Sequence, residues 1–540
     1  MREWRGAFDD RHDVIVVGSG AIGLTAALAA QRNGARVLVV EKSDHFGGTA
    51  ALSGGMLWVP MNRYMRSLQL HDSREGALQY LRAVTGGRTS EGILAALVDR
   101  GAEMLAFLND EAGVRFVAMD NFPDYHPEWE GAHAGGRSLD PELFDASVLG
   151  DLADSLRPDH RLPFTMVEYE AWGSFTNFPW EELRRRAADG LVARGRALVA
   201  PILHASAQGG VSLVSGAAAH RLIVEDGRVG GIELADGSRA TAGSGVIIAS
   251  GGFEWNAEMK ANFLPGPIDA TCAPPFNTGD GIRMAMRAGA AIGNMQEAWW
   301  FPMLLVGDEL DGQPTGTLPR FERTGPHTII VNRAGKRFVN EAHNYNDMTK
   351  AFHVFDPREY RLVNLPAYLL FDHQHLAKYG FLTHRAGQPT PAWLTEADTL
   401  EQLAEKLAID ADGLRDTVQR FNVNARSGVD PDFHRGESAY DRYWGDRGSD
   451  SPALGPLEQA PYYAIEIVSG AIGTKGGIVT DGDGRALDAF GDPVPGLFAA
   501  GNTTAHPMGP GYPGAGATLG PGCTMGFVAG RTCAAVPSPV

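Results

Sequence analysis

A strand, a glycine-rich turn and a helix follow one another near the start of this 540-residue chain, and they restrict its fold more than any other feature. A run of valine and isoleucine over 14–17 predicts a strand buried on both faces. The turn 18–23 reads Gly-Ser-Gly-Ala-Ile-Gly, a helix is predicted over 24–33, and a second buried strand, 36–40, runs into Glu41. The glycines let a pyrophosphate approach the helix N-terminus, and the acid suits ribose hydroxyls. This order predicts a dinucleotide-binding unit.

Two further segments favour FAD as the dinucleotide over NAD. The Gly-Gly pairs at 47–48 and 54–55 flank small and hydroxyl residues, which suits an extended backbone beside a long cofactor. At the other end of the chain, 495–502 is a short apolar strand that runs into glycine. Contacts from both ends predict a long ligand, and FAD fits. The predicted cofactor-binding residues are Gly18, Gly20, Ala21, Gly23, Glu41, Lys42, Gly48, Thr49, Ser53, Gly54, Gly55, Gly251, Gly501, Asn502, Ala517 and Leu519.

The predicted fold class is α/β, with a Rossmann-like FAD-binding domain assembled from both chain ends and an inserted α+β cap (catalytic) domain. The run 246–253 is typical of another central strand that ends in a cofactor-side glycine turn. We expect the FAD-binding domain over 1–273 and 462–540. We expect the cap over 274–461, where aromatic and polar loops dominate and a helix pair starts with the capping-box spacing of Thr399.

Charge and cysteine content exclude several classes of function. The net charge of −18 argues against a nucleic-acid partner, since phosphate binding needs clustered Lys and Arg. Cys272, Cys523 and Cys533 form no CxxC pair, so we predict neither a disulfide framework nor a metal site. No apolar run approaches about 20 residues, so we expect no integral membrane segment. Residues 1–13 lack the apolar core of a secretory signal, and we expect a cytoplasmic protein.

Glycine and proline dominate the stretch 501–522, which therefore forms no long regular element. Its backbone is suited to lie against a flat ligand, with the phenol of Tyr512 in the middle. From 497 to 530 the chain contains no Lys or Arg, so this stretch itself offers its ligand no cation. A small, apolar helix is predicted after it, with Pro521 at its first position. Its positive N-terminal end would favour an anionic reduced flavin.

Five motifs together carry a resemblance to a known family. They are the 18–23 turn with Glu41, the segment 47–60 with Trp58, Gly-Lys-Arg-Phe-Val-Asn-Glu at 335–341, Gly-Thr-Lys-Gly-Gly at 473–477, and Tyr-Pro-Gly-Ala-Gly at 512–516. Over nearly its whole length the chain resembles the FAD-dependent 3-ketosteroid Δ1-dehydrogenases, within the wider fumarate-reductase-like flavoproteins. The Tyr-Pro-Gly-x-Gly element is the most specific of the five, because the flavin motifs are shared by many relatives.

The resemblance implies catalytic roles for three tyrosines and a glycine. It implies that the Tyr512 hydroxyl and the Gly516 backbone N–H bind the ketone oxygen of the substrate. It further implies that Tyr345 is the base, with Tyr125 as its support; His126 is the alternative for this third position. Two donors facing the oxygen make chemical sense, since removal of a proton α to a ketone builds an enolate. A phenol has a pKa of about 10, so a tyrosine base needs an acidified α proton.

Several related activities stay open. The resemblance implies α,β-desaturation of a cyclic ketone, with 3-ketosteroid 1-dehydrogenation first, and another cyclic ketone, or enone reduction, as alternatives. A quinone or an electron-transfer protein would be the electron acceptor. A fumarate reductase needs arginines for a dicarboxylate, and here Arg320, Arg323 and Arg337 are the candidates in the cap. A non-catalytic flavin carrier is a further alternative, but it leaves the tyrosines unexplained.

Overall fold

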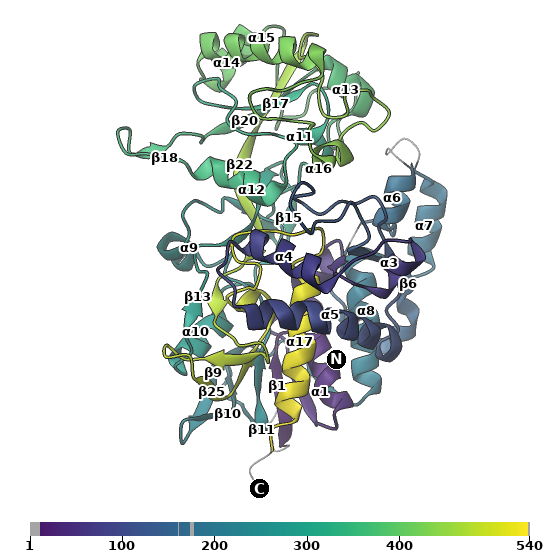
Figure 1. Ribbon diagram of the computed structural model, residues 1–540, viewed down its shortest axis with the longest axis vertical. Coiled ribbons are helices and arrows are strands. Elements are labelled where there is room, and N and C mark those ends of the chain that lie inside the picture. Colours follow the sequence, from purple (N-terminus) through teal and green to yellow (C-terminus); the bar gives the residue numbers. More distant parts are fainter. Residues whose placement is uncertain (1–10, 160, 173–177, 538–540) are drawn as a thin grey trace.

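The computed structural model describes residues 11–159, 161–172 and 178–537. The polar segment before residue 11, in which no secretory signal was predicted, lies outside these residues. Two sheets lie at opposite ends of an elongated molecule (Figure 1). Among the described helices, none is long and apolar enough to cross a membrane.

The main sheet combines strands from both ends of the chain. Five of them run parallel, in the order β25, β11, β1, β2, β8. In this order C-terminal β25 is separated from N-terminal β1 only by β11. The strands are β24 (Arg485–Leu487), β25 (Pro493–Ala499), β11 (Arg239–Ile248), β1 (His12–Val17), β2 (Val37–Val40) and β8 (Ser212–Val214), with β10 (Arg228–Leu234) and β9 (Ala219–Glu225) attached to β11. The apolar side chains of β1 and β2 are buried on both faces, as predicted for central parallel strands.

Helices from both chain ends pack side by side over this sheet (Figure 1). α1 (Ala21–Arg32) and α17 (Leu519–Ala534) approach so closely that a Cβ at Gly530 would lie 2.2 Å from the carbonyl oxygen of Ala26. α17 begins two residues before Pro521, so the proline occupies its third position and not the first. α5 (Glu91–Glu111) and α8 (Arg194–Gln208) complete this layer.

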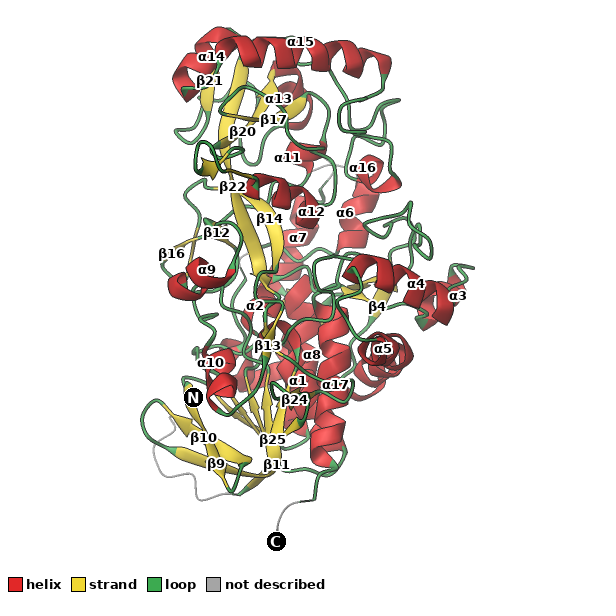
Figure 2. Cartoon of the chain, turned by 60° about the vertical axis from the view of Figure 1, so that its left-hand side comes forward, coloured by secondary structure: helices red, strands yellow, loops and turns green. Residues whose placement is uncertain are grey.

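The second sheet is built around the long strand β22 (Tyr462–Thr474), which extends from the α14 end of the molecule toward its middle (Figure 2). Its other strands are β12 (Ala270–Thr271), β14 (Ala298–Leu304), β17 (Thr328–Asn332), β20 (Ala367–Asp372) and β21 (Thr395–Ala397). Both predicted domain boundaries cut across this sheet. β12 and β22 had been placed in the FAD-binding domain, but both pair with strands of the second sheet.

The predicted helix pair is present and packs as expected. Thr399 caps α14 (Leu400–Leu407) by accepting a hydrogen bond from the Gln402 N–H, and Asp410 caps α15 (Ala411–Ser427). The apolar stripes of both helices are buried against the second sheet. The remaining helices are α2 (Gly48–Leu52), α3 (Arg63–Ser67), α4 (Arg74–Thr85), α6 (Met166–Trp172), α7 (Trp180–Ala188), α9 (Ala257–Phe263), α10 (Asp280–Arg287), α11 (Phe321–Thr324), α12 (Tyr345–Lys350), α13 (His373–Tyr379) and α16 (Ala439–Tyr443).

Short strands occupy the loops between these elements. They are β3 (Leu57–Trp58), β4 (Phe116–Ala118), β5 (Ser138–Pro141), β6 (Phe144–Asp145), β7 (Leu191–Val192), β13 (Ile292–Gly293), β15 (Glu309–Leu310), β16 (Gln313–Pro314), β18 (Phe355–Asp356), β19 (Arg361–Leu362) and β23 (Gly477–Ile478). β3, β4 and β5 form a small sheet of their own. β3 lies beside α17 and so links this small sheet to the main layer of helices.

Candidate active site

A large cavity lies between the two sheets. On one side its lining includes Val17 and Val40, which end the parallel strands β1 and β2. On the other side it includes Phe301 of β14 and Ile472 of β22. In open α/β sheets ligands bind at the carboxyl ends of the parallel strands, and this cavity occupies that position.

The predicted cofactor residues line this cavity with two exceptions, Gly23 and Ala517. Gly23 instead permits close packing inside the turn, since a Cβ there would lie 2.1 Å from the Gly18 carbonyl oxygen. Ala517 is fully buried in the apolar cluster that contains Trp58 and Tyr512. Both residues therefore shape the site without bordering its space.

The glycine turn has the geometry of a phosphate cradle. Gly18 has a φ of +105°, and a Cβ there would lie 2.4 Å from the Ala249 carbonyl oxygen, so only glycine fits. Gly20 precedes α1 and no side chain caps that helix, so the first N–H groups of α1 are free to bind an anion. A Cβ at Gly20 would meet no protein atom closer than 4.0 Å, because this residue borders the open cavity. These residues fit the pyrophosphate of FAD.

Glu41 and Lys42 are both already engaged in hydrogen bonds. The Glu41 carboxylate accepts hydrogen bonds from the Ser19 N–H (3.1 Å), the Ser19 hydroxyl (2.6 Å) and the Ser43 N–H (2.9 Å). The acid thus holds the glycine turn as well as bordering the cavity. The Lys42 ammonium donates to Asp280 at 2.7 Å and to the Thr278 hydroxyl at 2.7 Å. Lys42 therefore fastens the loop before α10.

The tertiary fold also brings to the cavity residues that were not predicted to bind the cofactor. Asn277 donates hydrogen bonds to the Thr49 hydroxyl (2.9 Å) and to Glu254 (2.7 Å). Arg157, Arg161 and Arg320 also line the cavity. The stretch 497–530 itself contains no Lys or Arg, and these three arginines reach the cavity from other segments.

The three predicted tyrosines meet at one end of the cavity. The hydroxyl oxygens of Tyr125 and Tyr345 are 2.7 Å apart and hydrogen-bonded. The ring of Tyr512 lies 5.0 Å from that of Tyr125 and 5.4 Å from that of Tyr345. The Tyr512 hydroxyl is 3.2 Å from that of Thr518. All three tyrosines line the cavity.

Gly516 combines a special backbone conformation with an unused donor. Its φ is +93°, and a Cβ there would lie 2.6 Å from the carbonyl carbon of Leu57, so no larger residue fits. Among the residues that the structure describes, its N–H has no hydrogen-bond acceptor. It lines the same cavity as Tyr512. A hydroxyl and a free amide beside one cavity are suited to hold a single oxygen atom.

Buried polar groups fasten the segments that carry these tyrosines to one another. The Lys475 ammonium donates to the Gly511 carbonyl (2.8 Å), next to Tyr512, and to the Asn346 side chain (3.1 Å), next to Tyr345. The N–H of Tyr125 donates to the Pro513 carbonyl at 2.9 Å. The spacing of the tyrosines is therefore set by bonds and not only by ring packing.

The pKa values of the tyrosines are raised. Burial raises the pKa of Tyr125 and Tyr345 well above the ordinary value of a phenol, and burial also raises that of Tyr512. All three are neutral phenols near pH 7. A neutral phenol can donate a hydrogen bond to an oxygen, and it can act as a base only toward a proton that has been made more acidic.

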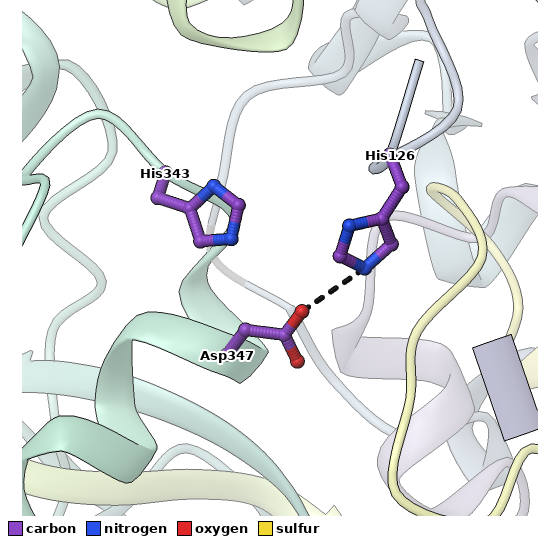
Figure 3. A group of neighbouring side chains, drawn as sticks. All are labelled: His126, His343 and Asp347. Atoms are coloured by element: carbon purple, nitrogen blue, oxygen red, sulfur yellow. Dashed lines mark ion pairs between the residues drawn. The ribbon is translucent and has the colours of Figure 1, made fainter. Parts of the chain in front are cut away.

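His126, the alternative to Tyr125, belongs to a different cluster (Figure 3). Its Nε2 lies 3.0 Å from a carboxylate oxygen of Asp347, and its ring stacks on Trp129 at 3.8 Å. His343 completes the group, whose nitrogen and oxygen atoms lie within 4.8 Å of one another. His126 is absent from the cavity lining, so the residue that contacts Tyr345 there is Tyr125.

The fold and the cavity define a flavoprotein oxidoreductase that binds FAD. A family model described as an FAD binding domain matches residues 13–519, so the chain belongs to this family of FAD-dependent flavoproteins. The chain is 52% identical to a 4-oxocyclohexanecarboxylate 2-dehydrogenase of Sinomonas cyclohexanicum, over 97% of this chain and 93% of that protein. It is 40% identical to a 3-oxosteroid 1-dehydrogenase of Mycolicibacterium smegmatis, over 97% of each chain.

Solved structures show the same fold. The 3-ketosteroid Δ1-dehydrogenase of Sterolibacterium denitrificans, in complex with 1,4-androstadiene-3,17-dione, superposes with a TM-score of 0.90 at 37% identity, covering 97% of this chain and 99% of that one. A flavocytochrome c3 fumarate reductase superposes with a TM-score of 0.67 at 22% identity, covering 97% of this chain and 78% of that one. The second likeness is one of fold alone.

Proposed function

We propose that this enzyme dehydrogenates a cyclic ketone and places a double bond between the carbons α and β to the carbonyl. The arrangement at one end of the cavity supports this most directly: the Tyr512 hydroxyl, the free Gly516 N–H and the hydrogen-bonded pair Tyr125–Tyr345 border a single space. Such a set suits an oxygen that gains negative charge beside a carbon that loses a proton.

The chain's own residues would divide the work as follows. Tyr512 and Gly516 hold the ketone oxygen and stabilise the enolate, which acidifies the α proton. The Tyr345 oxygen takes that proton and passes its own phenolic proton to Tyr125 along their 2.7 Å hydrogen bond, while Tyr125 releases its proton to solvent in the cavity that it lines. Bound FAD would supply the acceptor for the hydride that leaves the β carbon. The substrate thus loses a proton and a hydride, and a C=C bond forms.

The relatives favour two substrate classes. The 52% identity to a 4-oxocyclohexanecarboxylate 2-dehydrogenase makes a substituted cyclohexanone our first candidate. A 3-ketosteroid is the second, favoured by 40% identity to a 3-oxosteroid 1-dehydrogenase and by the TM-score of 0.90 to a steroid-bound relative. Of the three cap arginines considered for a dicarboxylate, Arg323 binds backbone carbonyls and Arg337 pairs with Glu341, which disfavours the fumarate-reductase alternative.

Three further expectations stay as proposals: the domain division, the cellular setting and the electron acceptor. We divide the chain into an FAD-binding domain around the main sheet and a cap around the second sheet, and we place β12 and β22 in the cap because of their pairing. The described thiols of Cys272, Cys523 and Cys533 are free, which supports a reducing, cytoplasmic setting. A quinone or an electron-transfer protein would reoxidise the flavin.

The test is anaerobic reduction of the FAD-loaded enzyme by ketones. 4-Oxocyclohexanecarboxylate, its methyl ester and 4-androstene-3,17-dione are each mixed with the oxidised protein while the flavin absorbance is followed. Bleaching within seconds by at least one ketone, with formation of the matching enone, is the expected result. A flavin that no ketone bleaches, but that a reduced partner protein does, would identify an electron carrier and refute the proposal.

A further inference from the structure

We propose that Arg320 is the binding residue for a carboxylate on the substrate ring, so that the cavity holds a ketone at the tyrosine end and an anion at Arg320. The inference rests on the proposed function and extends it, because it names a residue that separates a carboxylated cyclohexanone from a steroid. Arg320 lies between β16 and α11, and its side chain lines the cavity that Tyr345 and Tyr512 also line.

The backbone around Arg320 is tied to the segment that carries Tyr345. Three residues further on, the buried guanidinium of Arg323 donates hydrogen bonds to the backbone carbonyls of Glu341 and His343. The His343 carbonyl lies two residues before Tyr345. The segment that carries Arg320 is therefore fixed relative to the tyrosine cluster and is not an independent loop.

Of the three arginines that line the cavity, Arg320 is the one whose charge is not engaged in an ion pair with a described residue. Arg157 forms an ion pair with Asp311 at 2.7 Å, and Arg161 forms one with Asp159 at 2.7 Å. The guanidinium of Arg320, by contrast, has neither an ion pair nor a hydrogen bond within the ranges that the structure describes. Its acidic neighbour Glu322 forms no ion pair with it among the described residues. Burial raises the pKa of that carboxyl, against the smaller opposing effect of the Arg320 charge.

The charge of Arg320 reaches the tyrosine end of the cavity. It acts to lower the pKa of both Tyr125 and Tyr512, against the larger effect of burial. An anion bound at Arg320 would therefore lie within electrostatic range of the ketone-binding groups. The remaining lining near the tyrosines is largely apolar, with Phe122, Phe301, Leu318, Trp444 and Ile472.

The chemistry of the first candidate suits this arrangement. In 4-oxocyclohexanecarboxylate the carboxylate is attached to the ring carbon opposite the ketone, so one end of the molecule is a neutral oxygen and the other an anion. A carboxylate placed against apolar walls alone would be costly, whereas an arginine repays that cost with a charge-assisted hydrogen bond. A steroid presents hydrocarbon in the same direction and gains nothing from Arg320.

The experiment compares two ligands on three forms of the FAD-loaded protein. Arg320→Gln, Arg320→Lys and the wild type are assayed with 4-oxocyclohexanecarboxylate and with its methyl ester, which has the same ring and no charge. We expect Arg320→Gln to lower kcat/KM for the acid by about 10-fold or more, mainly through KM, and to leave the ester within about 2-fold. Arg320→Lys should restore part of the loss. Because Arg320 is exposed, the loss should shrink as ionic strength rises.

Controls separate this inference from the proposed function. Arg358→Gln removes an exposed arginine that pairs with Asp356, away from the cavity lining. This variant should change kcat/KM for neither ligand. Binding of the acid is also measured by the change in flavin absorbance at equilibrium, which needs no turnover. Three results would each overturn the role of Arg320. The first is an unchanged affinity of Arg320→Gln for the acid, and the second is an equal loss of kcat/KM for acid and ester. The third is a wild type that binds only the ester and the steroid. Failure of all ketones to reduce the flavin, with carboxylate-selective binding intact, would overturn the proposed function alone.

Discussion

The ion pair between His126 and Asp347 links the loop after Tyr125 to helix α12, which begins at Tyr345 (Figure 3). The Asp347 and Glu128 carboxylates outweigh burial and raise the pKa of His126 from 6.5 to about 9, although burial is the largest single influence. Between these two pH values the folded protein binds a proton that the unfolded chain does not. The stabilisation is thus fully present below pH 6.5 and is lost as the pH rises through about 9.

The size of the effect follows from this shift. A pKa difference between 6.5 and about 9 corresponds to about 3 kcal/mol of folding free energy. For 540 residues, an unfolding entropy of about 2.1 cal/mol/K per residue gives about 1.1 kcal/mol/K. If the chain melts as one unit, the pair is therefore worth about 3 °C in melting temperature. The lowered pKa of Asp347 reflects the same pair and adds nothing further.

The assay is thermal unfolding of the FAD-loaded wild type and of His126→Gln from pH 6 to 10. Gln keeps a donor for Asp347 but carries no titrating proton. We expect the melting temperature of the wild type to exceed that of the variant at pH 6 and the gap to close by about pH 10. His434→Gln, at an exposed pair with Glu437, is the matched control and should show no comparable gap. A constant gap across the pH range, or one that widens with pH, would refute the reasoning.

Three substitutions test the rest of the site. Tyr512→Phe should slow flavin reduction by the best ketone about 100- to 1000-fold in stopped-flow traces, as loss of one oxyanion donor does, and a normal rate would remove Tyr512 from that role. Gly516→Ala should lower the melting temperature and the rate together, because its φ of +93° and the backbone of Leu57 leave no room for a Cβ; wild-type values would contradict the geometry. Lys475→Met should slow reduction while the bound-flavin spectrum is kept, and an unchanged rate would mean that its bonds do not position the tyrosines.

The parts of the fold that the sequence predicted well are those that depend on the spacing of neighbouring residues. The strand, glycine turn and helix from 14 to 33 need only neighbouring residues to be recognised, and the structure differs by starting α1 at Ala21. The caps Thr399 and Asp410 likewise depend on residues three positions away. The predicted domain boundaries cut across the second sheet, because β22 pairs with β14, β20 and β21, and pairing between distant strands leaves no local signal.

The site residues, too, divide into those that local sequence predicts and those that only the tertiary fold reveals. The glycine-rich cofactor segments were predicted from their composition, but Asn277 and Arg320 reach the cavity only through the tertiary fold. The 2.7 Å contact between Tyr125 and Tyr345 joins residues 220 positions apart, and only the family resemblance pointed to it. The choice between Tyr125 and His126 needed coordinates, since adjacent residues in a loop point to different clusters.

The role of Tyr345 as the acceptor of the α proton is the central claim, and one measurement tests it most directly. FAD-loaded wild type and Tyr345→Phe are mixed anaerobically with the ketone that reduces the wild type fastest, and the flavin absorbance is followed through one turnover. We predict that the variant keeps its bound-flavin spectrum and its affinity for the ketone but is reduced at least about 100-fold more slowly. Reduction of Tyr345→Phe at the wild-type rate would contradict the account.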